Sequence, residues 1–209
     1  MYTLYTLPGS CSTGIVVLLE KLGVPYQLIK RNDAGDYQKI VPTNQVPALK
    51  TEDGRIITEG AAIALYLLEK HDNSMLPADI EDRSEFYQWL NFDYSTLHPA
   101  YGRMFAIAYK VKLSDEVKAE TLQQLADSVS SLWAILDKRL ETRKFILGDQ
   151  PTHADYMAAV YSGWNAGFAD TKIELGKNVK RFIADVASLK EFKAAFEKEG
   201  IEFKNPIEV

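Results

Sequence analysis

The sequence predicts an α/β domain followed by an all-helical domain. Strand and helix signals alternate over the first 70 residues, and a polar segment then leads into Leu76-Pro77. Beyond that step, apolar residues recur only at the spacing of helices. We therefore place the first domain at residues 1–74 and the second at residues 82–209.

The first domain begins with a strand–helix–strand unit. Residues 2–7 are rich in β-formers, apolar residues of 15–22 follow at helical spacing up to Gly23, and residues 26–30 form a second strand. Two strands joined by a helix are expected to be parallel. Residues 47–51 and 55–58 flank an Asp-Gly turn that favours a hairpin, with a helix starting near residue 60.

The second domain shows three clear helical signals. A long apolar stripe occupies residues 122–140, in a helix that starts after Ser114 as its expected cap. Thr152 and Asp155 have the spacing of a capping box. Phe192 and Phe196 mark a last helix, which is expected to end at residue 200.

Composition limits the possible partners and compartment. The net charge is −5 without a basic stripe, which argues against nucleic-acid binding. No apolar run reaches the roughly 18 residues of a membrane span, and no signal peptide precedes the first strand. Cys11 is the one cysteine and cannot form an intramolecular disulfide. We expect a soluble, cytoplasmic protein with no nucleic-acid or membrane partner.

Two motifs in the first domain predict a binding site. Pro47 opens an apolar strand, so Val46 before it is extended and its backbone groups are available to a bound peptide. The N–H groups of the helix that begins near Gly60 form an anion site, and the Glu59 carboxylate could hold an ammonium group. A ligand with a peptide backbone, a carboxylate and an amine fits all three features.

Together with residues 8–12 (PGSCS), these motifs resemble the glutathione transferases, and the Cys11 context is most similar to the bacterial beta class. The resemblance covers nearly the whole chain. It implies a thioredoxin-like first domain in which a cis Val46-Pro47 bond binds the cysteinyl backbone of glutathione. It also implies that Glu59-Gly60 receives the γ-glutamyl end, although many classes have serine where this chain has Gly60.

Cys11 is the main candidate for chemistry. A helix N-terminus can lower a cysteine pKa to about 3.5–7.5, whereas most structural free cysteines are buried and inert. The resemblance implies that Cys11 contacts the glutathione sulfur or forms a mixed disulfide with it. Ser10, Ser12 and Tyr5 are the alternative hydroxyl groups, because other classes hold the thiolate with a serine or a tyrosine.

A second group of candidates lies on the first long stretch of the helical domain. Asn91, Ser95 and His98 are spaced i, i+4, i+7, so they share one face of a regular helix. That face is either solvated or, as the resemblance implies, borders the cleft. His98 would then accept or donate a proton near Cys11. Pro99 is expected to kink or break the helix.

The remaining predictions concern charged and aromatic residues. Lys30 or Arg31 would pair with the glycine carboxylate of glutathione, and we choose Lys30 from the resemblance. His71 and His153 are expected at the surface or near a helix cap. No cluster has metal-ligand spacing, so we expect no metal. An apolar second substrate would contact aromatic and apolar residues of the helical domain: Tyr101, Met104, Phe105, Tyr109, Tyr161 and Trp164.

The predicted function is transfer of glutathione, as co-substrate, to a small hydrophobic electrophile. Two alternatives remain open: thiol–disulfide exchange through Cys11, and a non-catalytic protein that binds a ligand or partner. The resemblance further implies a role in detoxification and a homodimer.

Overall fold

The computed structural model describes residues 1–71 and 74–207. Its N-terminal part contains a four-stranded sheet in the order β2-β1-β3-β4. Strand β1 runs parallel to β2 and antiparallel to β3, and β3 runs antiparallel to β4. The strand–helix–strand unit and the hairpin predicted from the sequence are therefore confirmed. The strands are β1 (Tyr2–Thr6), β2 (Tyr26–Lys30), β3 (Ala48–Lys50) and β4 (Ile56–Thr58).

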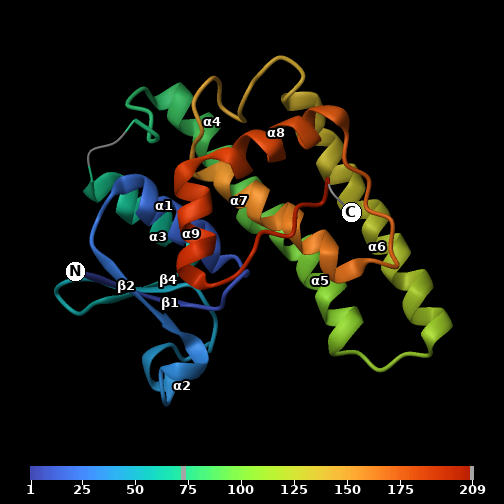
Figure 1. The fold of residues 1–209 in the computed structure, drawn as a ribbon, viewed down its shortest axis with the longest axis horizontal. Helices are drawn as coiled ribbons and strands as arrows, with labels where there is room; N and C mark the ends of the chain where they lie inside the picture. The colour runs from blue at the N-terminus through green and yellow to red at the C-terminus, as the bar shows by residue number, and fades with distance from the viewer. Residues whose placement is uncertain (72–73, 208–209) are drawn as a thin grey trace.

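Helices cover both faces of this sheet (Figure 1). One face packs on α1 (Ser12–Leu22) and α3 (Gly60–Lys70), while α2 (Tyr37–Ile40) lies on the other. Side chains alternate along β1, so Leu4 joins the large core with α1 and Tyr5 joins a small core with Tyr37. Neither α2 nor the 3₁₀ turn η1 (Arg31–Asp33) before it was predicted from the sequence.

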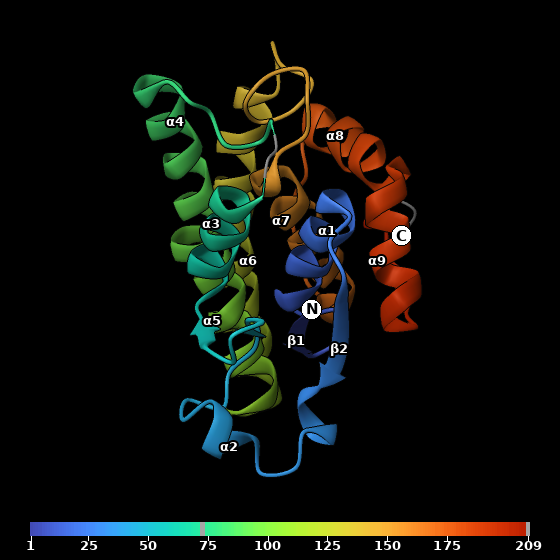
Figure 2. The same cartoon turned by 90° about the vertical axis from the view of Figure 1, so that its left-hand side faces the viewer.

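The rest of the described chain is helical, as predicted. The last helix returns to the N-terminal part, where it packs along α1 (Figure 2). Asp72 and Asn73, which belong to the polar segment before Leu76-Pro77, lie outside the described residues. Within residues 1–71 and 74–207, no helix is both long and apolar enough to cross a membrane. The segments are α4 (Ile80–Asn91), η2 (Phe92–Leu97), α5 (His98–Tyr109), α6 (Asp115–Arg139), α7 (His153–Ser162), η3 (Gly163–Phe168), α8 (Lys177–Ser188) and α9 (Lys190–Glu199).

Helix α7 is buried along its whole length and packs directly on α1. A Cβ atom added at Gly14 of α1 would lie 2.0 Å from the Met157 sulfur, so only glycine allows this approach. The capping box is confirmed: Thr152 N and Oγ1 donate to Asp155 Oδ2 at 2.7 and 2.9 Å. Ser114 occupies the predicted cap position of α6, but its side chain makes no capping hydrogen bond.

Pro99 does not break the helix. It lies in the first turn of α5, which follows the π-helix η2 without interruption, so the helical hydrogen bond that proline cannot donate is missing at the junction of the two elements. The irregularity comes before it, because η2 is a π-helix in which His98 N donates to Asp93 O. A π-turn is wider than an α-turn, so side chains after Phe92 are rotated relative to a regular helix.

Candidate functional site

Most of the predicted site residues border one cleft between the N-terminal part and the helices. Its volume is about 630 Å³. Three segments of the N-terminal part meet there: the loop before α1, the segment before β3 and the start of α3. The lining residues are Cys11, Arg31, Thr43, Asn44, Gln45, Val46, Pro47, Thr58, Glu59, Gly60, Ala61, Tyr94, Ser95, His98 and Lys110.

Cys11 stands at the N-cap position of α1, where the loop after β1 turns into the helix. Its Sγ donates to Val46 O at 3.5 Å. Burial raises the pKa of the Cys11 thiol to about 11, although hydrogen bonds from Ser10 and from backbone N–H groups act in the opposite direction. Desolvation therefore outweighs the helix N-terminus, which by itself would lower the pKa of this thiol.

The segment before β3 is held in place from α2. Tyr37 Oη donates to Gln45 O at 2.8 Å, one residue before the Val46-Pro47 bond. That bond is cis, and Pro47 is buried immediately before β3. Val46, just before this bond, lines the same cleft as Cys11.

The start of α3 forms another wall. Glu59 is the N-cap of α3 with φ +65°, and its exposed side chain makes no capping hydrogen bond. A Cβ atom added at Gly60 would lie 2.2 Å from Tyr94 Cε1. The tyrosine ring therefore explains why glycine stands here, where the resemblance would allow serine.

The helical wall differs from the predicted one. Ser95 and His98 line the cleft, but Asn91 does not: it ends α4, and its Nδ2 donates to Tyr87 O at 2.8 Å. The π-turn separates Asn91 from the other two and brings Tyr94 into the wall. Burial lowers the pKa of His98, which favours the neutral ring.

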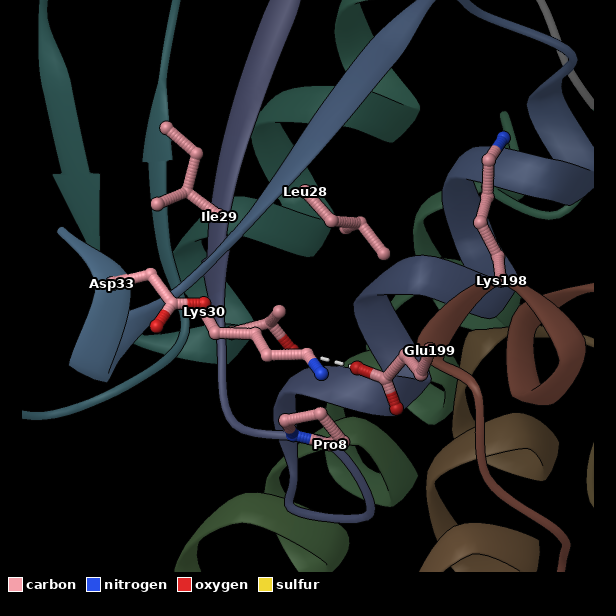
Figure 3. Close-up of a pocket in the computed structure, with 8 residues that line it drawn as sticks. Pro8, Leu28, Ile29, Lys30, Asp33, Lys198 and Glu199 are labelled. Carbon is pink, nitrogen blue, oxygen red and sulfur yellow. Dashed lines mark hydrogen bonds between the residues drawn. The ribbon is translucent and has the colours of Figure 1, made fainter.

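Three other candidates lie away from the cleft surface. Lys30 lines a separate cavity of about 470 Å³ and points toward Glu199 there (Figure 3). Its neighbour Arg31 lines the cleft instead. Tyr5 is buried against Tyr37, with ring centroids 5.4 Å apart. Ser10 is outside the lining, and its Oγ is 2.8 Å from Ser12 Oγ.

Several aromatic predictions also need correction. Tyr101, Met104 and Tyr161 are fully buried in the main core and so cannot form an open pocket wall. Trp164 is partly buried and donates from Nε1 to Gly9 O at 2.7 Å, which ties the helical part to the Cys11 loop. His153 adjoins a cap as predicted, but it is fully buried rather than at the surface.

Sequence reasoning missed Tyr94 and Lys110 as lining residues. Tyr94 Oη lies 3.0 Å from His153 Nε2, and burial raises its pKa well above the ordinary value. No local pattern distinguishes Tyr94 from a core tyrosine, since its position depends on the π-turn. Across the described residues, no group of three or more His, Cys, Asp or Glu side chains is arranged to hold a metal ion.

Comparisons with known proteins agree with this arrangement. Residues 9–70 match the model of the glutathione S-transferase N-terminal domain, and residues 96–190 match that of the C-terminal domain. The glutathione S-transferase GstA of Escherichia coli O157:H7 is 27% identical over 207 residues, covering 95% of this chain and 98% of that protein.

Solved structures share the fold over almost the full length. A glutathione S-transferase from Xylella fastidiosa superposes with a TM-score of 0.85 at 23% identity, covering 97% of this chain and 100% of that one. A sphingomonad glutathione S-transferase solved with glutathione has a TM-score of 0.80 at 27% identity, covering 96% and 100%. With its thioredoxin-like sheet and helical second part, the chain belongs to the glutathione S-transferase family.

Proposed function

We propose that the protein binds glutathione in the 630 Å³ cleft and transfers it to a small apolar electrophile. The observation that carries this proposal is the convergence of Cys11, the Val46-Pro47 edge and the Glu59-Gly60 helix start on that one cleft. These features are far apart in the sequence and match different parts of one ligand. The family membership of the chain supports the same reading.

Each part of glutathione has a proposed partner. The Val46 backbone pairs with the cysteinyl backbone of the ligand. The first N–H groups of α3 bind the γ-glutamyl carboxylate, and Glu59 binds the γ-glutamyl ammonium group. Arg31 replaces Lys30 as the proposed partner of the glycine carboxylate, because Arg31 lines the cleft and Lys30 lines the other cavity.

The raised pKa of Cys11 favours transfer over thiol exchange. With a pKa of about 11, Cys11 is a thiol at neutral pH. A thiol can donate a hydrogen bond to the glutathione thiolate, whereas attack on a disulfide requires the cysteine thiolate. Neutral His98, on the same cleft, is the proposed acceptor of the glutathione thiol proton.

The test measures two reactions in the wild type and in Cys11→Ala, with Cys11→Ser as a matched control. For transfer to an activated aryl chloride, we expect Cys11→Ala to stay within about tenfold of wild type, or ~1.4 kcal/mol in the barrier. Reduction of a small disulfide should fall by at least ~10²-fold if Cys11 forms a mixed disulfide with glutathione. Loss of both activities in Cys11→Ala would contradict the donor role.

Thiol exchange is the second candidate function, because Cys11, the only thiol of the chain, lines the cleft. In that reaction Cys11 sulfur would attack oxidised glutathione, form the mixed disulfide and release one glutathione thiolate. Intact mass spectrometry would show one glutathione adduct on the wild type and none on Cys11→Ala. If the protein binds glutathione but catalyses neither transfer nor disulfide reduction, the result would instead support a non-catalytic protein that binds a ligand or a partner.

The proposal extends to the setting of the reaction. We propose a cytoplasmic homodimer acting in detoxification, in keeping with the family resemblance and with a chain that has a single cysteine.

A further inference from the structure

The helical wall of the cleft is polar rather than apolar. Each residue that the helical part contributes to the lining carries a polar group: Tyr94, Ser95, His98 and Lys110. The expected apolar contacts Tyr101, Met104 and Tyr161 are fully buried in the main core instead. A second substrate that enters the cleft therefore meets polar side chains on this side.

Lys110 is the charged member of this wall, because burial favours the neutral ring of His98. Lys110 directly follows α5, and its side chain is exposed. Within residues 1–71 and 74–207, no salt bridge reaches its ammonium group. The cation is therefore available to a ligand in the cleft.

The segment around Lys110 is basic as well. Residues 94–114, which run from the π-turn through α5 to the start of α6, contain Arg103, Lys110 and Lys112 but no Asp or Glu. The whole chain, by contrast, has a net charge of −5. A cationic surface beside a cleft attracts anions and raises their local concentration.

Glutathione, bound as proposed above, leaves one cation of the cleft without a partner. The charged side chains of the lining are Arg31, Glu59 and Lys110. The start of α3 binds the γ-glutamyl carboxylate and Glu59 binds the ammonium group, so only the glycine carboxylate requires a cation. Arg31 fills that role from the N-terminal part, which also carries Glu59 and α3. Lys110 remains on the helical wall.

We propose that Lys110 is a specificity-determining residue that binds an anionic group of the electrophile, so that the preferred second substrates are small electrophiles that carry a carboxylate. This assignment rests on the proposed function, because it concerns the second substrate of the same cleft. It narrows that function from apolar electrophiles in general to those with a negatively charged group on an apolar body.

The probes are two aryl chlorides that differ in one group: a chlorodinitrobenzoate and the chlorodinitrobenzamide of the same substitution pattern. In both, the glutathione thiolate attacks the carbon that bears chlorine, a C–S bond forms, and chloride leaves with the electron pair of the C–Cl bond. The thiol proton goes to His98, as proposed above. Each kcat/KM is divided by the rate constant of the uncatalysed reaction, which removes the difference in intrinsic reactivity.

On this scale the wild type should favour the benzoate over the benzamide by about fivefold, the discrimination that one partly hydrated ion pair provides. Lys110→Gln should remove the preference by lowering the benzoate value alone, with KM for glutathione within about twofold of wild type. Lys110→Glu should reverse the preference, because like charges repel.

The matched control is Lys112→Gln. Lys112 lies in the same basic segment and is exposed, but it is not part of the cleft lining. Its replacement removes the same charge from the chain and should keep the preference for the benzoate.

A second measurement needs no turnover. Titration calorimetry compares the two finished S-aryl glutathione conjugates, one with the carboxylate and one with the carboxamide. We expect the carboxylate conjugate to bind wild type about fivefold more tightly, and the two conjugates to bind Lys110→Gln equally. If neither aryl chloride reacts but this difference in binding is present, the transferase function fails and the role of Lys110 in anion binding stands.

Three results would overturn the proposal. Equal values for the two aryl chlorides in the wild type, with equal binding of the two conjugates, would do so and leave the transferase function intact. An equal loss with both electrophiles in Lys110→Gln would place Lys110 at glutathione or at the reacting ring instead. A loss of preference in Lys112→Gln as large as in Lys110→Gln would show a general effect of surface charge.

Discussion

At residue 60, an added Cβ atom would lie 2.2 Å from Tyr94 Cε1 and 2.8 Å from Tyr94 Oη. Tyr94 cannot easily give way, because its hydroxyl group is bonded to His153 Nε2 and contacts the Met157 sulfur. The glycine and the tyrosine are therefore a matched pair in the cleft wall. A larger residue at position 60 would move either the start of α3 or the tyrosine ring.

We expect Gly60→Ala to lower the free energy of unfolding by about 1–3 kcal/mol, the usual cost of overpacking. Gly102→Ala is the control: Gly102 lies inside α5 with no atom near its missing Cβ. That substitution should stabilise the protein by about 0.5–1 kcal/mol, because alanine is the better helix former. Urea unfolding of both variants checks the pair, and equal stability of Gly60→Ala and wild type would contradict the steric argument.

Glu59 is expected to contribute to ligand affinity rather than to folding, since its side chain makes no capping bond. Glu59→Ala should weaken glutathione binding by about 1.5–3 kcal/mol, the scale of a hydrogen bond to a charged group. Titration calorimetry measures the change, with Glu69→Ala at the far end of α3 as a charge-matched control. Unchanged affinity in Glu59→Ala would remove the proposed γ-glutamyl site.

Among the elements, α7 links the cleft to the interior of the helical part. Its first residue, His153, is fully buried, and no hydrogen-bond partner within the described residues reaches its Nδ1. Burial lowers the pKa of His153 to about 3. The ring is therefore neutral in the folded protein throughout the neutral pH range.

This burial predicts a definite pH dependence. The unfolded chain binds a proton at His153 near the ordinary pKa of about 6.5, whereas the folded protein does so only near 3. Between these values the unfolded state holds more protons, so acidification costs up to ~1.4 kcal/mol of stability per pH unit. His153→Gln should reduce this slope between pH 6 and 4 in urea titrations. An unchanged slope in His153→Gln would contradict this prediction.

On the scale of the whole molecule, the cleft depends on contacts between distant parts of the chain. Helix α9 packs on α1, Glu199 bonds the loop after β1, and Trp164 donates to Gly9 O. The helical part therefore supports the loop that carries Cys11. We expect the two parts to unfold together.

We also expect a homodimer, with the sheet part of one copy packed on the helices of the other about a two-fold axis. Light scattering at micromolar concentration should give twice the 23.5-kDa mass of the chain. A dilution series serves as the control, because a weak association would dissociate across it. A monomer mass at every concentration would contradict this prediction.

Local patterns in the sequence were enough to predict the order of the main elements. The β1–α1–β2 unit, the hairpin, the capping box of α7 and the end of α9 all follow from period, turn residues and caps. Cys11, Val46-Pro47 and Glu59-Gly60 were recognisable because each motif is formed by adjacent residues. In the folded chain the three motifs line one cleft.

Tertiary structure decided what no local pattern contains. The π-turn of η2 separated Asn91 from the cleft and brought Tyr94 into it, because helical spacing assumes a regular turn. The path of the chain after β2 put Arg31 rather than Lys30 at the cleft. Desolvation raised the pKa of Cys11, and Glu199 reached Thr6 across 193 positions of sequence. Burial and long-range contacts depend on how whole elements pack, so they appear only once the chain is folded.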